Sequence, residues 1–382
     1  MKKFNPLTFL ASLGAGGIAI APFVYFQYIV PHGEGLTTFH EVMQQATTGA
    51  GEFGVWLMAS VMLLFGVVHF ALTFKLLASF LSWRKTDDYK KYIRDPQQNT
   101  TIMASFTSFA MSFNVLIGAV RFFVPAMQNH FQELMLPALI AWTLLWLWLM
   151  GTEIRILKTA FEGDFNISNI SFGWLMQPFA LGMISVSGMG IAAMAHNPDI
   201  AGTAAFLSMI SATMGLFLFL VKLISVFQSH FSTAGMPDRQ FLPSFLIVVP
   251  VLTIYAISFF RFGHYLENNF DIQLSAFYQF VVAVPFAFQT WYLGFGMTML
   301  MDYFKKDFFR KEYYVTLWAF ICPFVGYAVL GSFFHKFFAP VTVVEGLILA
   351  SGVLAVLFYG FFSVRYLKFS QNDIKVVAEQ SA

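Results

Sequence analysis

The stretch Leu139–Met150, LIAWTLLWLWLM, is apolar on every side apart from Thr143. A membrane-spanning strand would alternate polar and apolar residues, and this stretch does not. An α-helix satisfies its backbone hydrogen bonds within the segment, as any chain that crosses lipid must do. The stretch therefore predicts a transmembrane helix, and it indicates that lipid is the main solvent of this protein.

Apolar runs of about 20 residues, the length that a bilayer requires, recur ten times in the 382 residues. The predicted fold class is an all-α integral membrane protein with a single transmembrane domain over residues 1–382. Short connections leave no room for a soluble domain between the runs. We expect the helices near 8–30, 53–76, 101–124, 133–155, 171–195, 202–226, 240–260, 274–301, 313–334 and 344–366.

The composition excludes several classes of protein. Hydrophobic residues make up 58% of the chain and charged residues only 11%, whereas soluble domains carry about 25% charged residues. A soluble enzyme, a disordered chain and a nucleic-acid binder are therefore excluded. The net charge of +2 indicates no polyanionic partner. The single cysteine, Cys322, excludes an intramolecular disulfide and a zinc site built from several thiolates.

The lysines and arginines test the helix count independently. With the N-terminus in the cytoplasm, 18 of the 22 basic residues fall in cytoplasmic segments and two in outside connections. This bias is the positive-inside signal, and it predicts ten helices with both termini cytoplasmic. The alternative is a signal peptide cleaved after Ala21. The apolar run continues through Phe23–Val30, longer than a signal peptide needs, so we expect the first helix to be retained.

A proline recurs in the odd-numbered helices at a period of roughly 70 residues. Pro178, Pro250 and Pro323 are 72 and 73 residues apart, while the first helix has Pro22 and the third has Pro125 at its outer end. Proline bends a membrane helix and frees a carbonyl, which survives where protein or a water-filled cavity shelters it. The repeat predicts five helical hairpins around a central pore. The alternative is that membrane helices simply tolerate proline.

Polar residues on the odd-numbered helices extend the pore hypothesis. Ser105, Ser108 and Ser112 share one face of the third helix, although small hydroxyls more often serve helix–helix contact. Mid-helix acids are absent from the predicted spans, and Glu153 lies close to a helix end, which argues against a carboxylate relay. Cations near the outer ends predict an anion-attracting mouth, with snorkelling at the interface as the alternative. These cations are Arg121, Arg261, His264 and Lys336.

Neither a cofactor nor an enzyme activity is predicted. A membrane cytochrome needs pairs of histidines at compatible depths, and only His69 lies deep in a predicted helix. We expect His69 to be a packed, hydrogen-bonded helix residue. A phosphate-binding glycine loop, a Ser/His/Asp pattern and a zinc-protease motif are all absent from the sequence. We therefore expect no haem and no bound metal.

The topology and three short motifs resemble a known family. The motifs are Leu317–Pro323 (LWAFICP), Asp95-Pro96 before the third helix, and Trp174 with Pro178 on the fifth. The family is the tellurite-resistance/dicarboxylate transporter family, which includes bacterial TehA and the slow-type anion channels of plant guard cells. The resemblance implies a multi-pass protein of the bacterial inner (plasma) membrane. It also implies a homotrimer in which the five odd-numbered helices of each subunit line a separate pore.

The resemblance further implies the substrates and the gate. Members pass chloride, nitrate, sulfite, malate or related dicarboxylates, and a phenylalanine directly before the proline of helix 9 plugs the pore. Here that position is Cys322. A thiol at the constriction leaves the pore open or gated by a neighbour such as Phe320 or Phe106. It would also react with soft chalcogen oxyanions such as selenite or tellurite. The alternative is an inert, buried cysteine beside the proline.

The sequence as a whole predicts a membrane channel or transporter that passes small inorganic or organic anions down their gradient. One alternative is a proton-coupled transporter of sulfite or a C4-dicarboxylate, which would show pH-dependent, saturable flux. The other alternative is a membrane sulfur or redox protein that uses Cys322.

Overall fold

The computed structural model describes residues 4–33, 35–163, 170–232 and 237–370, and this part of the chain contains helices and no strand. Ten helical spans within it are long and apolar enough to cross a membrane. This finding confirms the predicted all-α membrane fold. The spans are Pro6–Ile29, Gly49–Trp83, Asn99–Phe123, Met135–Glu162, Phe172–Met194, Pro198–Ser232, Leu242–Phe270, Ser275–Met299, Val315–Phe337 and Thr342–Phe369.

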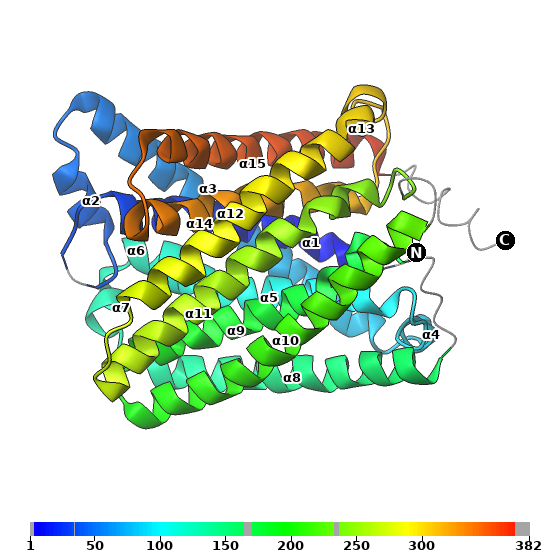
Figure 1. Cartoon of the computed structure of the whole chain (residues 1–382), viewed down its shortest axis with the longest axis horizontal. Coiled ribbons are helices and arrows are strands. Elements are labelled where there is room, and N and C mark those ends of the chain that lie inside the picture. The colour runs from blue at the N-terminus through cyan, green and yellow to red at the C-terminus, as the bar shows by residue number, and fades with distance from the viewer. Residues whose placement is uncertain (1–3, 34, 164–169, 233–236, 371–382) are drawn as a thin grey trace.

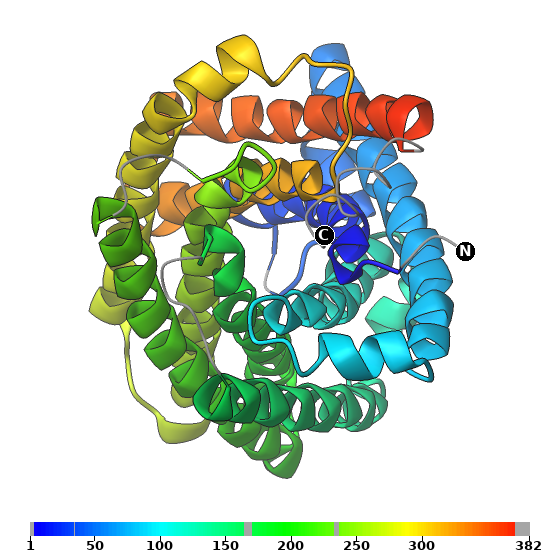
Figure 2. The ribbon, with the colours of Figure 1, turned by 90° about the vertical axis from the view of Figure 1, so that its right-hand side faces the viewer.

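The odd-numbered spans form an inner layer and the even-numbered spans an outer one. In the most apolar window of each odd-numbered span, 67% to 100% of the residues are buried inside the molecule, against 22% to 44% for the even-numbered spans. Figure 2 looks along the bundle and shows the outer helices surrounding the inner ones. The inner helices are α1 (Phe9–Ile29), α5 (Met103–Val115), α9 (Met176–Met194), α11 (Val248–Phe270) and α14 (Ile321–Phe337). The outer helices are α3 (Gly49–Trp83), α8 (Met135–Glu162), α10 (Pro198–Ser232), α12 (Ser275–Met299) and α15 (Thr342–Phe369).

The five inner helices close a ring. Helix α1 packs against α5, α5 against α9, α9 against α11 and α11 against α14, and α14 returns to α1. Each inner helix also packs against the outer helix of the next span, as α1 does with α3 and α14 with α15. The chain is therefore arranged as five helical hairpins around a shared axis.

Every inner span begins with a short 3₁₀ helix that passes directly into the α-helix. Pro178, Pro250 and Pro323 are each the third residue of the α-helical part, and Ser105 holds the same place in α5. The first N–H groups of an α-helix have no partner within it, so proline there removes no hydrogen bond of the helix. The three prolines therefore lie in the first turn of the α-helical part of each span, whereas Pro22 lies inside α1. The 3₁₀ helices are η1 (Pro6–Thr8), η2 (Asn99–Ile102), η5 (Phe172–Leu175), η6 (Leu242–Ile247) and η7 (Val315–Phe320).

The two ends of the bundle differ in charge. One end, called the basic end below, contains the starts of the inner spans, α4 (Asp87–Tyr92) and α13 (Met301–Lys306) (Figure 1). The opposite end contains α2 (Phe39–Gln45), α6 (Arg121–Phe123) and α7 (Pro125–Asn129). The beginning of α1 and the end of α15 both lie at the basic end. This arrangement matches an even number of crossings, and the positive-inside rule makes the basic end the expected cytoplasmic side.

Candidate functional site

A cavity of about 100 Å³ lies inside the ring of inner helices, and it is called the central cavity below. All five inner helices contribute to its wall, which is mostly apolar. The lining residues are Leu13, Gly17, Ile20 and Val24 of α1, Met111 and Asn114 of α5, Phe179, Met183 and Val186 of α9, Pro250, Thr253, Ile254, Ile257 and Arg261 of α11, and Cys322, Val325, Gly326, Val329 and Phe333 of α14.

Glycine brings α14 close to α11 beside the central cavity. A Cβ atom at Gly326 would lie 3.0 Å from Thr253 Oγ1 and 3.1 Å from the Cα atom of Pro250. Thr253 Oγ1 lies 3.0 Å from the carbonyl oxygen of Gly326 and 3.0 Å from Oε1 of Gln289 on α12. The hydroxyl thus joins two inner helices and one outer helix through polar contacts in an apolar layer.

Arg261 is the charged residue of the cavity wall. Its Nη1 donates to the carbonyl oxygen of Val186 on α9 at 2.7 Å and lies 3.4 Å from Oδ1 of Asn114 on α5. Asn114 is itself held by its Nδ2, which donates to Ser187 Oγ at 3.0 Å. A π-helical turn, η3 (Leu116–Val120), follows Asn114 in the same span. Such turns are frequent at functional sites.

Cys322 lines the central cavity at the start of α14, toward the basic end. Its side chain is buried. Of the three prolines of the repeat, Pro250 lines the cavity. The carbonyl oxygen of Pro178 accepts a 2.7 Å hydrogen bond from Tyr255, which ties α9 to α11. Pro323 is buried next to Cys322 and is not among the lining residues of the cavity.

The two phenylalanines named as alternative gates point away from the central cavity. Phe320 lies in η7, and its ring packs 5.9 Å from that of Tyr303 and 5.5 Å from that of Phe304. Phe106 packs 5.2 Å from the ring of Trp148 on α8. Both side chains are fully buried between an inner and an outer element. The structure therefore does not place either ring in the cavity.

The serine face of α5 turns toward α1 and α3 rather than toward the central cavity. Ser108 Oγ donates to Ser12 Oγ at 3.0 Å, and Ser112 Oγ lies 2.9 Å from Nε2 of His69. His69 Nδ1 lies 2.8 Å from the backbone oxygen of Ser12, and the His69 side chain is fully buried. Ser105 donates to a backbone carbonyl one turn earlier. These hydroxyls join helices, and His69 is the packed, hydrogen-bonded residue that we expected.

Of the four cations of the expected outer mouth, one lines the central cavity. Arg261 lines the central cavity, whereas Lys336 is exposed on the last turn of α14. His264 lies 3.1 Å from the hydroxyl of Tyr278 and 3.7 Å from a carboxylate oxygen of Glu267. The first residue of α6, Arg121, is buried and is not among the lining residues of the central cavity. Arg261 is therefore the residue of this set that lies at the central cavity, and a shared outer mouth stays a prediction.

A second, larger cavity of about 760 Å³ lies among the loops at the opposite end. Arg121 is part of its wall, together with His130, His196 and several amide side chains. The Nη1 atom of Arg121 donates to the backbone oxygens of Leu36 at 3.1 Å and Thr37 at 3.4 Å. Arg121 therefore holds the segment after α1 in place through Nη1, while its buried Nε has no hydrogen-bond partner among the described residues.

A buried carboxylate lies within a span, which the sequence did not predict. Helix α8 extends to Glu162, so Glu153 is inside it and fully buried. Gln177 at the start of α9 donates to Glu153 Oε1 at 2.8 Å. Lys222 of α10, also buried, interacts electrostatically with Glu153, and its Nζ lies 4.2 Å from the ring centroid of Trp174. Placing Glu153 close to a helix end was therefore wrong.

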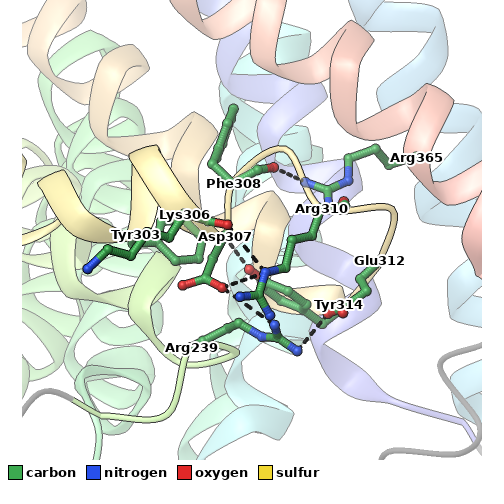
Figure 3. Close-up of polar contacts among 9 residues, drawn as sticks. All are labelled: Arg239, Tyr303, Lys306, Asp307, Phe308, Arg310, Glu312, Tyr314 and Arg365. Carbon is green, nitrogen blue, oxygen red and sulfur yellow. Dashed lines mark hydrogen bonds and ion pairs between the residues drawn. The ribbon is translucent and has the colours of Figure 1, made fainter.

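A network of charged residues fixes the segment that leads into η7 at the basic end (Figure 3). Arg239 pairs with Glu312 at 2.7 Å and with Asp307 at 3.5 Å. Arg365 of α15 is buried and donates to the backbone oxygens of Phe308 and Arg310. The segment 307–312, called the basic-end latch below, is thus tied both to the connection before α11 and to α15.

Two tyrosines lie beneath the basic-end latch. The hydroxyls of Tyr303 and Tyr314 contact each other. Burial raises the pKa of Tyr303, and the neighbouring Tyr314 raises it further. Burial also raises the pKa of Tyr314. Both rings therefore stay neutral at physiological pH and act as packing and hydrogen-bonding groups. Within the described parts of the chain, no group of three or more His, Cys, Asp and Glu side chains is placed to hold a metal ion.

Comparison with known proteins identifies one family. The family model described as SLAC1, voltage-dependent anion channel, matches residues 3–367 and so covers nearly the whole chain. No curated protein matches the sequence.

Proposed function

We propose, since the chain belongs to the SLAC1 family of voltage-dependent anion channels, that it passes small anions through the central cavity. Membership makes this integral, multi-pass membrane protein an anion channel or transporter. The passage of small anions through the central cavity is our proposal. The pathway runs along the axis enclosed by α1, α5, α9, α11 and α14.

The proposal rests on which helices form the wall of the central cavity. Residues of all five inner helices line one cavity, and its charged residue is a cation, Arg261. Because a single chain supplies the complete wall, each subunit of an oligomer such as the implied homotrimer would hold its own pathway. A positive group in a low-dielectric wall favours anions over cations.

The walls favour passive flow over tight binding of a large substrate. Most lining side chains are aliphatic, aromatic or methionine, and the polar ones besides Arg261 are few. A C4-dicarboxylate would bring two negative charges into this wall. We therefore propose a channel for small anions as the main function, with the electrochemical gradient as the driving force.

Reconstitution into planar bilayers or liposomes tests this function. We expect currents whose reversal potential follows the chloride or nitrate gradient and ignores the sodium or potassium gradient. Protein-free membranes and membranes that contain the Cys322→Phe variant are the controls. A pathway that carries cations, or no anion flux under any imposed gradient, would refute the proposal.

The single thiol offers a direct test of the route. Cys322 lines the central cavity and is the only cysteine of the chain, so a small methanethiosulfonate reagent has one possible target. We expect modification to reduce anion flux in the natural protein and to leave Cys322→Ser unaffected. The same variant tests the redox alternative, because a protein that uses the thiol chemically would lose activity as Cys322→Ser without any reagent.

A proton-coupled transporter is the second candidate, and the buried Glu153 favours it. A carboxylate inside a span, hydrogen-bonded to Gln177 and close to Lys222, is a group that coupling of protons to transport uses. This candidate predicts that a pH gradient alone drives anion uptake and that Glu153→Gln abolishes that uptake. Flux that follows voltage and is the same at every imposed pH gradient would favour the channel.

A further inference from the structure

Arg261 places a positive charge against the central cavity without a neutralising partner. Across the residues that the structure describes, no carboxylate oxygen lies within ion-pairing distance of its guanidinium. The nearest acid along α11, Glu267, is already engaged by the hydroxyl of Tyr278, by the backbone N–H of Leu274 and by His264. A charge in an apolar surrounding that lacks a counter-charge carries a large desolvation penalty.

The local contacts aim the guanidinium and leave part of it free. Nη1 is used by the carbonyl oxygen of Val186 and by Oδ1 of Asn114. Both of these contacts come from Nη1, and no hydrogen bond joins Nη2 or Nε to a described residue. Gly190 provides the space, since a Cβ atom there would lie 2.9 Å from Nη1. An arginine has five N–H donors in a fixed fork, so the remaining donors are available to a ligand in the cavity.

We infer that Arg261, positioned by Asn114, forms a discrete binding site for one monovalent anion in the central cavity and makes the pathway select monovalent over divalent anions. This inference deepens the proposed function and rests on it. The nature of the ligand follows from charge balance. A single guanidinium neutralises one negative charge, and the wall offers no second cation.

The apolar wall increases the difference in binding free energy between monovalent and divalent anions. A divalent anion such as sulfate or a C4-dicarboxylate would keep one unpaired charge among aliphatic and aromatic side chains. The cost of moving an ion out of water rises with the square of its charge, and the wall supplies little to replace that hydration. Halides and nitrate lose much less hydration free energy on entering the cavity. The free N–H donors of Arg261 can also donate to one or two oxygens of nitrate.

The first experiment measures binding without transport. The thermal unfolding midpoint of the purified full chain in detergent is followed as sodium nitrate replaces sodium gluconate at constant ionic strength, with sodium sulfate in a parallel series. We expect a saturable rise with nitrate, because a ligand that binds the folded state raises its stability. Sulfate should give only the non-saturating rise of an excluded salt, the same in the natural protein and in Arg261→Gln. Arg261→Gln removes the nitrate effect, and Arg261→Lys keeps it at a higher nitrate concentration.

A matched control removes one positive charge elsewhere. Lys158 pairs with Glu162 at 3.7 Å on the surface of α8, and Lys158→Gln should retain the full response to nitrate. If Arg261→Gln fails to fold, Asn114→Ala tests the same site. It frees the guanidinium to turn away, and the nitrate concentration for half-maximal stabilisation should rise at least several-fold.

The second experiment measures reversal potentials in bilayers with nitrate on one side and sulfate on the other. We expect strong nitrate selectivity in the natural protein and a loss of at least tenfold in the permeability ratio in Arg261→Gln. Equal stabilisation of Arg261→Gln and the natural protein by nitrate, or unchanged selectivity, would overturn the inference while the channel function stands. Nitrate-dependent stabilisation without any current would overturn the proposed function while the binding site stands.

Discussion

Replacing Cys322 by phenylalanine should close the central cavity. Cys322 lies at the start of α14 and lines the central cavity together with Leu13, Phe179 and Pro250. A cavity of about 150 Å³ accommodates a benzene ring, and the central cavity measures about 100 Å³. The new ring would therefore occupy the whole space that an anion uses.

The expected loss of flux is large. An obstruction that raises the barrier by about 1.4 kcal/mol already lowers a rate about tenfold, and a filled cavity leaves no hydrated route at all. We therefore expect the anion flux of Cys322→Phe to fall by at least this factor in liposomes. Overpacking costs roughly 1 to 3 kcal/mol of stability, so the unfolding midpoint of the variant must be measured first.

Two controls separate obstruction from damage. Cys322→Ser keeps the small volume of the side chain and should conduct like the natural protein. Phe320→Leu changes a neighbouring aromatic that packs against Tyr303 and Phe304 of α13. This variant should leave conduction unchanged. A folded Cys322→Phe protein that conducts as well as the natural one would refute the assignment of the cavity as the pathway.

Two further predictions concern stability. A Cβ atom at Gly188 would overlap the ring of Trp142, so Gly188→Ala should destabilise the protein by roughly 1 to 3 kcal/mol. Gly151→Ala, where no atom lies within 4 Å of the new Cβ, should leave the unfolding midpoint unchanged or raise it. Arg365→Gln should lower the midpoint and expose the basic-end latch to protease, since each lost hydrogen bond of a charged donor costs about 1.5 to 3 kcal/mol. Lys368→Gln, an exposed change one turn later on α15, should do neither, and equal effects of the two variants would contradict the role of Arg365.

The ten spans were predictable because hydropathy and charge asymmetry are local properties of the chain. Each inner helix is buried on most of its surface, so periodicity alone did not distinguish the face toward the cavity from the face toward a neighbouring helix. The serines of α5 show the difficulty. Ser108 and Ser112 do share a face, but that face meets Ser12 and His69, while Met111 and Asn114 face the cavity.

The prediction for the prolines was limited for a related reason. Their spacing identified the repeat correctly, yet proline fits both a kink inside a helix and the first turn of a helix. The 3₁₀ helix that precedes each of the three prolines depends on how the span enters the bundle, and no local residue pattern announced it. Asn114 was the overlooked polar residue of the cavity. An isolated amide in an apolar inner span could have been predicted from the sequence to face the cavity.

Because α1 packs against α14, the ring of inner helices is closed, and its contacts do not depend on which hairpin comes first in the chain. The first and last helices begin and end at the same side of the membrane (Figure 1). Joining the two termini by a linker and reopening the chain between two other hairpins at that side would leave every inner-helix contact in place. Circular permutants that begin at any of the five hairpins should therefore adopt the same fold.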